Sequence, residues 1–402
     1  MKFSVPTNWH NDLLPIFNSP EIYEVYGKLA EDFVGGGRPA YSLPNVSKHR
    51  VIRYLEEIHK SSCEFNYLLN ASCLGGREFT RKGQKEIFSL LDWLVKIGVD
   101  SVTVSLPYLT ELIKYRYSSL KINVSVMAHV DSIEKAKFWE SLGVSSITLL
   151  HTRLNRNFKL LQKIKKNVKC QLQLIANNHC LYDCPLEEYH EIFNSHASQV
   201  KQSNGNFIFD YCYLTCRYKK IFSPKLLISS PWIRPEDVSL YEQMGIDSIK
   251  LVDRRLTSAE LIKIINAYTG REYEGNLLDL FPALGGISPV SLSNIVLRTK
   301  HFFHPFSANI FMVPKLRYLL KKIEVFIDNK ALDGFINFFL THNCQVMSCE
   351  DCGYCREISE RVVKIDKDYQ NKICQEYRKF LGALYSGRAF RYFKKYQNHN
   401  VK

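Results

Sequence analysis

Short runs of strand-forming residues alternate with longer amphipathic stretches over the first 270 residues of this 402-residue chain. The predicted strands, in chain order, are 3–5, 22–26, 65–69, 101–105, 122–127, 146–150, 170–176, 226–229 and 249–252. The predicted helices are 46–59, 81–97, 107–116, 131–142, 154–166, 235–244 and 257–268. Strands that alternate with helices of about 10 to 15 residues are typical of βαβ units, which build a parallel sheet.

Three of these strands follow nearly the same short segment, Ile97–Ser101, Leu142–Ser146 and Met244–Ser248. In each segment a glycine follows a predicted helix, where a left-handed conformation costs little only for glycine. With about eight strands, we expect an α/β fold in which the sheet closes into a (β/α)8 barrel of the TIM type. The first strand is not followed by the Gly-x-Gly-x-x-Gly motif of a dinucleotide-binding open sheet.

The repeat stops near residue 271, and the sequence after it is mixed and interrupted by prolines at 282, 289, 305 and 314. We therefore predict a barrel with a Cys-rich insert over residues 1–270 and a smaller Cys-rich C-terminal region over 271–402. No run approaches the roughly 18 to 20 apolar residues of a membrane span, and the first residues lack a secretory signal. We expect a cytoplasmic protein without a membrane span.

Four cysteines form two Cys-x3-Cys pairs, Cys180 with Cys184 and Cys212 with Cys216. Each pair follows an apolar strand-like run, so we expect the four thiolates at the mouth of the barrel, around one metal centre. Without an export signal, grouped cysteines indicate metal binding more than disulfides. Four thiolates suit zinc or a [4Fe-4S] cluster equally. The position beside a catalytic mouth favours the cluster, with zinc and free thiols as alternatives.

A second cysteine group, Cys344-x4-Cys349-x2-Cys352-x2-Cys355, lies in the C-terminal region. Its ligands are so close in sequence that the backbone must wrap one centre, as in ferredoxin-like runs. We expect a second [4Fe-4S] cluster, with zinc as the alternative, although a zinc ribbon needs two knuckles held well apart. If the two clusters lie within about 10 to 15 Å, the C-terminal one could pass electrons to the other.

Polar residues just past the predicted strand ends include His129, Arg153 and Arg255. We expect these three residues to hold an anionic group of the substrate, because the planar guanidinium matches a carboxylate or a phosphate. A single histidine at such a position is also typical of a residue that only packs.

The formal net charge of +14 favours acidic partners, such as RNA or a small anionic substrate. A lysine-rich composition can carry the same charge without any such partner. The tail from Arg388 to Tyr396 interleaves cations with aromatic rings, a mixture that binds phosphates and stacks bases. The same pattern is typical of an amphipathic helix with its aromatic rings packed inward.

Four segments of the chain form a recognisable set: His179–Pro185, Cys212–Arg217, Ser230–Asp237 and Ile249–Arg255. Together they resemble the collagenase-like peptidase family, peptidase family U32, within a likeness that spans about residues 60–275. The resemblance implies that Cys180, Cys184, Cys212 and Cys216 hold a [4Fe-4S] cluster. It also implies a redox enzyme, since members include oxygen-independent hydroxylases that act on ubiquinone precursors or on RNA bases. Its partners would be a small-molecule or RNA substrate, and an electron donor or a paired family member.

The chain departs from the family pattern in its cysteine spacings and in Asp253-Arg254, where Glu-Gly is common. The family name implies proteolysis, but the sequence has neither a His-Glu-x-x-His zinc helix nor a Gly-x-Ser-x-Gly elbow. A peptidase-like hydrolase of the same family and a non-catalytic iron–sulfur scaffold are the alternative functions.

Overall fold

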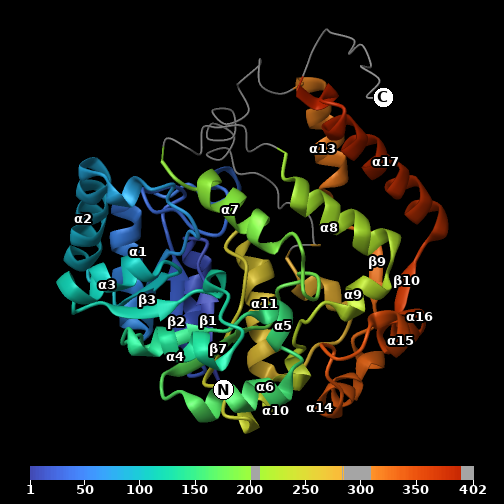
Figure 1. Cartoon of the computed structure of the whole chain (residues 1–402), viewed down its shortest axis with the longest axis horizontal. Helices are drawn as coiled ribbons and strands as arrows, with labels where there is room; N and C mark the ends of the chain where they lie inside the picture. The colour runs from blue at the N-terminus through green and yellow to red at the C-terminus, as the bar shows by residue number, and fades with distance from the viewer. Residues whose placement is uncertain (201–208, 283, 285–308, 391–402) are drawn as a thin grey trace.

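Eight parallel strands close into a barrel in the computed structural model, which describes residues 1–200, 209–282, 284 and 309–390 (Figure 1). Each strand pairs with the next one in the chain, and β8 pairs with β1, Ser248 beside Lys2. The strands are β1 (Lys2–Pro6), β2 (Ile22–Gly27), β3 (Glu64–Leu69), β4 (Ser101–Val104), β5 (Lys121–Val124), β6 (Ser146–Thr148), β7 (Gln171–Ile175) and β8 (Ser248–Lys250). The predicted TIM-type α/β barrel is confirmed.

Helices surround the barrel, and most of the longer ones bury an apolar face against it. In the first of them, α1, Val51, Leu55 and Ile58 recur at helical spacing and are buried. The helices of this part of the chain are α1 (Lys48–Lys60), α2 (Arg81–Lys96), α3 (Pro107–Arg116), α4 (Ile133–Ser141), α5 (His151–Leu154), α6 (Phe158–Asn167), α7 (Glu187–Ala197), α8 (Tyr211–Phe222), α9 (Lys225–Ser229), α10 (Val238–Gln243) and α11 (Ser258–Gly270).

The glycines that were predicted to end helices adopt the left-handed conformation. The φ angles of Gly98, Gly143 and Gly245 are 82°, 78° and 84°. The predicted strand at 226–229, in contrast, is wrong, because these residues belong to α9. Leu227 and Ile228 are neighbours and are both buried, and a short apolar run of this kind does not by itself distinguish a buried strand from a buried helix.

The interior of the barrel is filled by polar side chains and not by the branched apolar residues that dominate most TIM barrels. The buried carboxylate of Glu24 accepts hydrogen bonds from Ser4 Oγ, from Asn66 Nδ2 at 2.8 Å and from Asn123 Nδ2 at 3.1 Å. Every strand contributes to the polar ring, which we define as Ser4, Glu24, Asn66, Thr103, Asn123, Ser146, Gln173 and Ser248. Hydrogen bonds, not apolar contacts, therefore fill this layer of the barrel.

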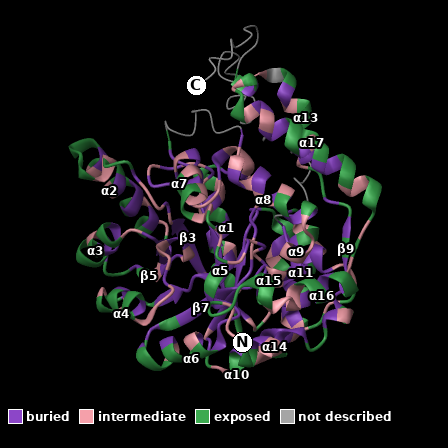
Figure 2. Cartoon of the chain, turned by 45° about the vertical axis from the view of Figure 1, so that its right-hand side comes forward, coloured by how far each residue is buried: buried purple, intermediate pink, exposed green. Residues whose placement is uncertain are grey.

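The alternate residues of the same strands point outward and are apolar. Val25, Val102, Leu172 and Ile249 are completely buried between the strands and the helices. Figure 2 shows this arrangement as buried strands inside helices whose outer faces are exposed. Because successive side chains of a strand point to opposite faces, a shift of one residue would bring apolar groups into the polar ring.

The described part of the C-terminal region packs on one side of the barrel. Its elements are α13 (Val313–Leu319), β9 (Val325–Ile327), α14 (Phe338–Thr341), α15 (Cys349–Cys352), α16 (Tyr354–Val362), β10 (Val363–Ile365) and α17 (Lys367–Tyr385). The α17 helix packs against α8, and α16 packs against α9. Arg217 of α8 is buried and donates a hydrogen bond from Nε to the Tyr377 hydroxyl of α17 at 3.0 Å.

The division of the chain into two domains at residue 270 stays a prediction. Residues 391–396 of the basic tail lie outside the described residues, so its predicted binding of nucleic acid stays a prediction too. Among the helices that the structure describes, none is long and apolar enough to cross a membrane.

We expect Glu24→Ala to lower the free energy of unfolding by about 3 kcal/mol or more, because the donors of the polar ring would lose their common acceptor inside the barrel. Urea unfolding monitored by circular dichroism would measure the change. The control is Glu64→Gln on the neighbouring strand, a carboxylate with 40% side-chain exposure that pairs with Lys121. We expect a change within about 0.5 kcal/mol there. Equal effects of the two substitutions would contradict the role of Glu24.

Candidate functional site

A cavity of about 330 Å³ opens at the C-terminal ends of the barrel strands. Polar and ionisable side chains from many segments line it, together with apolar ones. They include Arg38, Asn70, His151, Asn178, Cys180, Cys184, Glu187, His190, Glu191, Asp210, Cys212, Cys216, Arg217, Lys220, Lys250, Asp253, Arg254 and Arg255. The position is the one at which TIM-barrel enzymes place their active sites.

All four cysteines of the two Cys-x3-Cys pairs line this cavity. Cys180 and Cys184 lie in the loop between β7 and α7, while Cys212 and Cys216 are on α8, one helical turn apart on the same face. The sequence predicted a strand-like run before each pair. The first pair does follow β7, whereas residues 206–208 before the second pair lie outside the described residues.

The four thiols of this group affect one another electrostatically. Burial raises the pKa of Cys180, and Glu187, Cys216 and Cys184 raise it further, whereas Lys220 acts in the opposite direction. Burial likewise raises the pKa of Cys212 to about 12, with Asp210 and the other cysteines adding to the effect. Free thiols at Cys180, Cys184 and Cys212 would therefore be protonated at neutral pH, and a set of four thiolates in this cavity would need a bound cation to neutralise it.

Four thiols in one cavity could hold a single zinc ion or an iron–sulfur cluster. The four cysteines are not joined in disulfides. The described ranges hold no group of three or more His, Cys, Asp or Glu side chains placed to bind one metal ion. One zinc ion with Zn–S bonds of about 2.3 Å would bring its sulfurs within about 4 Å of each other. Each cysteine of a cluster binds a different iron, so the sulfurs can lie farther apart.

Three consecutive glycines bring an arginine to the opposite wall of the cavity. A Cβ atom on Gly36 would lie 2.9 Å from Asn70 Oδ1, and one on Gly37 would lie 2.9 Å from Met127 Sδ, so a larger residue would have to displace these side chains. The glycines let the loop lie on the barrel mouth, where Arg38 Nε donates to Asp253 Oδ2 at 2.7 Å. No role in the site was predicted for these glycines from the sequence.

Asp253 is held ionised between two arginines. Burial acts to raise its pKa, but Arg255 and Arg38 outweigh burial and lower it well below the ordinary value. Arg255 donates to Asp253 Oδ2 from Nε at 3.1 Å and from Nη2 at 2.8 Å. Arg254 is also buried and lines the cavity beside them, so this wall combines one carboxylate with three guanidinium groups.

Lys250 of β8 connects the cavity to the polar ring. Its ammonium group lies 4.0 Å from the centre of the Tyr26 ring. Burial lowers the pKa of Lys250 to about 8, Glu24 acts to raise it, and Arg254 lowers it. A lysine with a pKa near neutrality can take up or release a proton at this position.

A group of carboxylates lies on the α7 side of the cavity. Burial and the neighbouring Glu191 raise the pKa of Glu187 to about 7, and Thr152 Oγ1 donates to Glu187 at 2.9 Å. Burial also lowers the pKa of His151 to about 3, so this histidine is neutral. Its Nε2 lies 3.0 Å from Asn178 Nδ2, two residues before Cys180.

The three residues predicted to hold an anionic group do not come together. Arg255 lines the cavity, but Arg153 and His129 do not. Arg153 binds Asp183 at 2.6 Å and Asp131 at 2.9 Å, which ties the loop between Cys180 and Cys184 to the barrel. His129 Nε2 lies 2.6 Å from Glu191 Oε2 and so reaches the cavity only through that carboxylate.

The sequence analysis missed most of the cations of the site. Arg38, Lys250 and Arg254 were not predicted as site residues, although Lys250 and Arg254 occur in the segment Ile249–Arg255. A lysine at an inward position of a strand is the signal that could have found Lys250, because inward and outward residues alternate. The cysteines at 344, 349, 352 and 355 do not line this cavity.

Comparison with known proteins identifies related chains. The model for Peptidase family U32 matches residues 42–270. An uncharacterized protease of Methanocaldococcus jannaschii is 34% identical over 345 residues, which cover 86% of this chain and 90% of that protein. A solved structure of a U32 peptidase is 22% identical, with a TM-score of 0.47, and its alignment covers 63% of this chain and 93% of the other.

We expect Lys250→Met to stabilise the protein at pH 7, by up to about 3 kcal/mol. The pKa of Lys250 is about 8 in the folded protein and about 10.5 in the unfolded chain. Below pH 8 the folded protein bears the full cost of the buried charge, and this cost fades as the pH rises to 10.5. The gain should therefore shrink between these pH values.

Urea unfolding at pH 7 and pH 10 would measure this change. Lys82→Met, at an exposed position of α2, is the matched control and should show no such pH dependence. A gain that grows with pH would contradict the lowered pKa of Lys250.

Proposed function

This chain belongs to peptidase family U32, and from that membership we propose that it is an iron–sulfur-dependent redox enzyme. The reaction would be an oxygen-independent hydroxylation or a related oxidoreduction. One observation carries the proposal: Cys180, Cys184, Cys212 and Cys216, from two separate segments, line a single cavity together with buried cations. Four thiols and several guanidinium groups in one pocket favour a redox cofactor beside a substrate-binding site.

A [4Fe-4S] cluster bound by the four cysteines would supply one-electron redox chemistry at the cavity. The other residues of the site would bind and orient the substrate. Arg38 and Arg255 hold the Asp253 carboxylate in a fixed position, where it can accept a hydrogen bond from a substrate hydroxyl or amine. Lys250, with its pKa of about 8, is suited to exchange a proton with the substrate.

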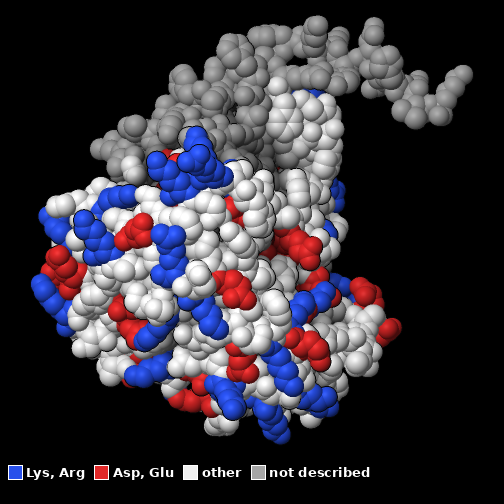
Figure 3. Space-filling model, turned by 60° about the vertical axis from the view of Figure 1, so that its left-hand side comes forward, with Lys and Arg blue, Asp and Glu red and all other residues white. Residues whose placement is uncertain are grey.

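The substrate that this cavity suits is small and anionic. Arg and Lys side chains outnumber Asp and Glu among the residues that line it. On the face of the molecule in Figure 3, Lys and Arg are interspersed with Asp and Glu instead of forming one basic surface. A biosynthetic intermediate is therefore favoured over extended RNA, although an RNA base turned into the cavity stays an alternative.

The hydroxylation would take its oxygen from water and remove two electrons and two protons from the substrate and the water together, so it needs an external electron carrier to accept the electrons. This carrier would be a separate protein or a paired member of the same family. Twelve cysteines without a disulfide in the described residues suit a reducing compartment, and we place the protein in the cytoplasm on that basis.

A peptidase-like hydrolase is the second candidate, and one observation favours it. Glu187, with its pKa raised to about 7, could act as a general acid or base near neutral pH. The Methanocaldococcus jannaschii relative is also named a protease. The four cysteines at the cavity are the feature that a hydrolase of this kind does not need.

The proposal predicts that protein purified without oxygen is brown, and that Cys216→Ser loses about four iron atoms per chain relative to the unchanged protein. Iron and acid-labile sulfide analysis would measure the loss. Cys73→Ser is the matched control, because Cys73 does not line the cavity, and it should keep all of its iron. Circular dichroism would establish that both variants are folded.

Hydrolysis of casein by the same preparations would test the alternative. Iron-free, colourless protein that cleaves casein, with Cys216→Ser as active as the unchanged protein, would favour the hydrolase and contradict the redox proposal.

A further inference from the structure

The four C-terminal cysteines lie together on one short turn of structure beside the barrel. Cys349 and Cys352 are the first and last residues of α15, and Cys355 is in the first turn of α16. Gly353, with a φ of 65°, reverses the chain between these two helices. Cys344 lies in the loop before α15, and the next residue, Gln345, accepts a hydrogen bond from Asn157 Nδ2 at 3.0 Å through its Oε1. This contact holds the loop beside the barrel, next to the residue that follows Arg156.

A buried arginine of the barrel, Arg156, lies beside this group. It is only 5% exposed, and its guanidinium carbon lies 4.6 Å from the Trp232 ring, 4.8 Å from Phe335 and 4.9 Å from Phe339. Nη1 donates to the Ile228 carbonyl at 2.8 Å. Nε and Nη2 are buried and have no hydrogen-bond partner within the residues that the structure describes.

A guanidinium ion enclosed by aromatic rings needs a negative charge close by, because its own charge is removed from water. Among the described residues no salt bridge of 4.0 Å or less involves Arg156. The Asp237 carboxylate acts on Arg156 electrostatically, but it pairs with Arg234 at 3.1 Å. Burial lowers the pKa of Arg156, and Cys355 and Cys344 are among the neighbouring groups that act to raise it. Four thiolates around a metal centre carry the net negative charge that Arg156 lacks, and their sulfurs accept hydrogen bonds.

We propose that Cys344, Cys349, Cys352 and Cys355 hold a second iron–sulfur cluster, with Arg156 as its buried counter-charge. Two donors of Arg156, Nε and Nη2, would bind the cysteine sulfurs or the cluster. A cluster suits the Cys349-x2-Cys352-x2-Cys355 spacing, which resembles the Cys-x2-Cys-x2-Cys runs of ferredoxins.

Aromatic rings in contact link the two cysteine groups. The ring centres of His179 and Phe281 are 5.1 Å apart, and those of Phe281 and Trp232 are 5.9 Å apart. From Trp232 the contacts continue to Phe335 at 5.5 Å and from there to Tyr354 at 5.6 Å. His179 directly precedes Cys180, and Tyr354 directly precedes Cys355.

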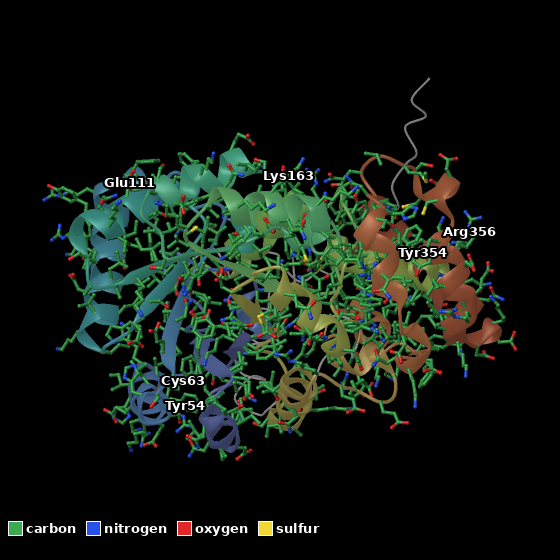
Figure 4. The ribbon with its side chains drawn as sticks, turned by 90° about the horizontal axis from the view of Figure 1, so that it is seen from below. Tyr54, Cys63, Glu111, Lys163, Tyr354 and Arg356 are labelled. Atoms are coloured by element: carbon green, nitrogen blue, oxygen red, sulfur yellow. The ribbon has the colours of Figure 1, made fainter. Side chains whose placement is uncertain are left out.

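This aromatic chain gives the second cluster a role, which rests on the proposed function of the barrel site. Hydroxylation with water as the oxygen source removes two electrons and two protons from the substrate and the water together. The barrel cluster would pass these electrons, one at a time, to the C-terminal cluster, and an external one-electron carrier would accept them there. Cys349 is exposed, so this group borders the solvent. Figure 4 places Tyr354 on α16, at the end of the molecule away from Glu111 of α3.

Iron analysis of matched variants would test the second cluster. The unchanged protein should bind about eight iron atoms per chain, and Cys349→Ser with Cys352→Ser should retain about four. Cys212→Ser with Cys216→Ser should also retain about four, and the Cys73→Ser control should retain all eight. Cys349→Ser alone, at an exposed position, provides the same test if the double variant does not fold.

The possible outcomes separate this inference from the proposed function. If the C-terminal double variant keeps all the iron that the unchanged protein binds, or if this group binds zinc, the second cluster is overturned while the barrel site stands. If only the barrel double variant keeps all its iron, the proposed function fails and the second cluster stands.

Stability alone cannot test whether Arg156 is the counter-charge of the C-terminal cluster, so the reduction potential is measured. Arg156→Met should shift the reduction potential of the C-terminal cluster to a more negative value, because a positive charge stabilises the reduced form. Arg156→Lys should retain most of the original potential, and neither variant should move the potential of the barrel cluster. A variant that is less stable but has an unchanged potential would overturn the counter-charge role.

Discussion

The hydrogen bonds of Glu24 inside the barrel are the interaction on which the rest of the structure depends. A carboxylate removed from water is stable only when donors surround it. Ser4, Asn66 and Asn123 supply those donors from three other strands, and the ring they begin passes through all eight. This polar ring fixes the register of the strands, and the register determines which residues meet at the mouth of the barrel.

The cavity lies next to the polar ring, at the C-terminal ends of the strands, and polar and charged side chains line it as well. Lys250 connects the polar ring with the cavity: it interacts electrostatically with Glu24 of the ring, and it lines the cavity together with Arg254. The mouth therefore combines a dense set of buried cations with four thiols, an arrangement that costs folding free energy. Proteins keep such costly groups mainly where they bind or transform a charged ligand.

The sequence was sufficient to predict the barrel, because its strands and helices alternate regularly and glycine marks the helix ends. It also grouped Cys180, Cys184, Cys212 and Cys216, which the structure brings to one cavity. It could not predict the contacts of Arg153 and His129. These depend on Asp183, in the loop after β7, and on Glu191, on α7, a helix that is missing from the elements predicted from the sequence. Arg38 was equally unpredictable, because only the folded loop brings it to Asp253.

Because α17 packs on α8, the cysteine site of the barrel depends on contacts with the C-terminal region. The family match ends at residue 270, yet α8 carries Cys212 and Cys216, and its Arg217 is anchored by Tyr377 of α17. The wall of the cysteine site is thus supported by a helix that lies about a hundred residues beyond the matched segment. The smallest transplantable unit of this site is the barrel together with its C-terminal helices, and a chimera cut at the end of the barrel would leave α8 without its support.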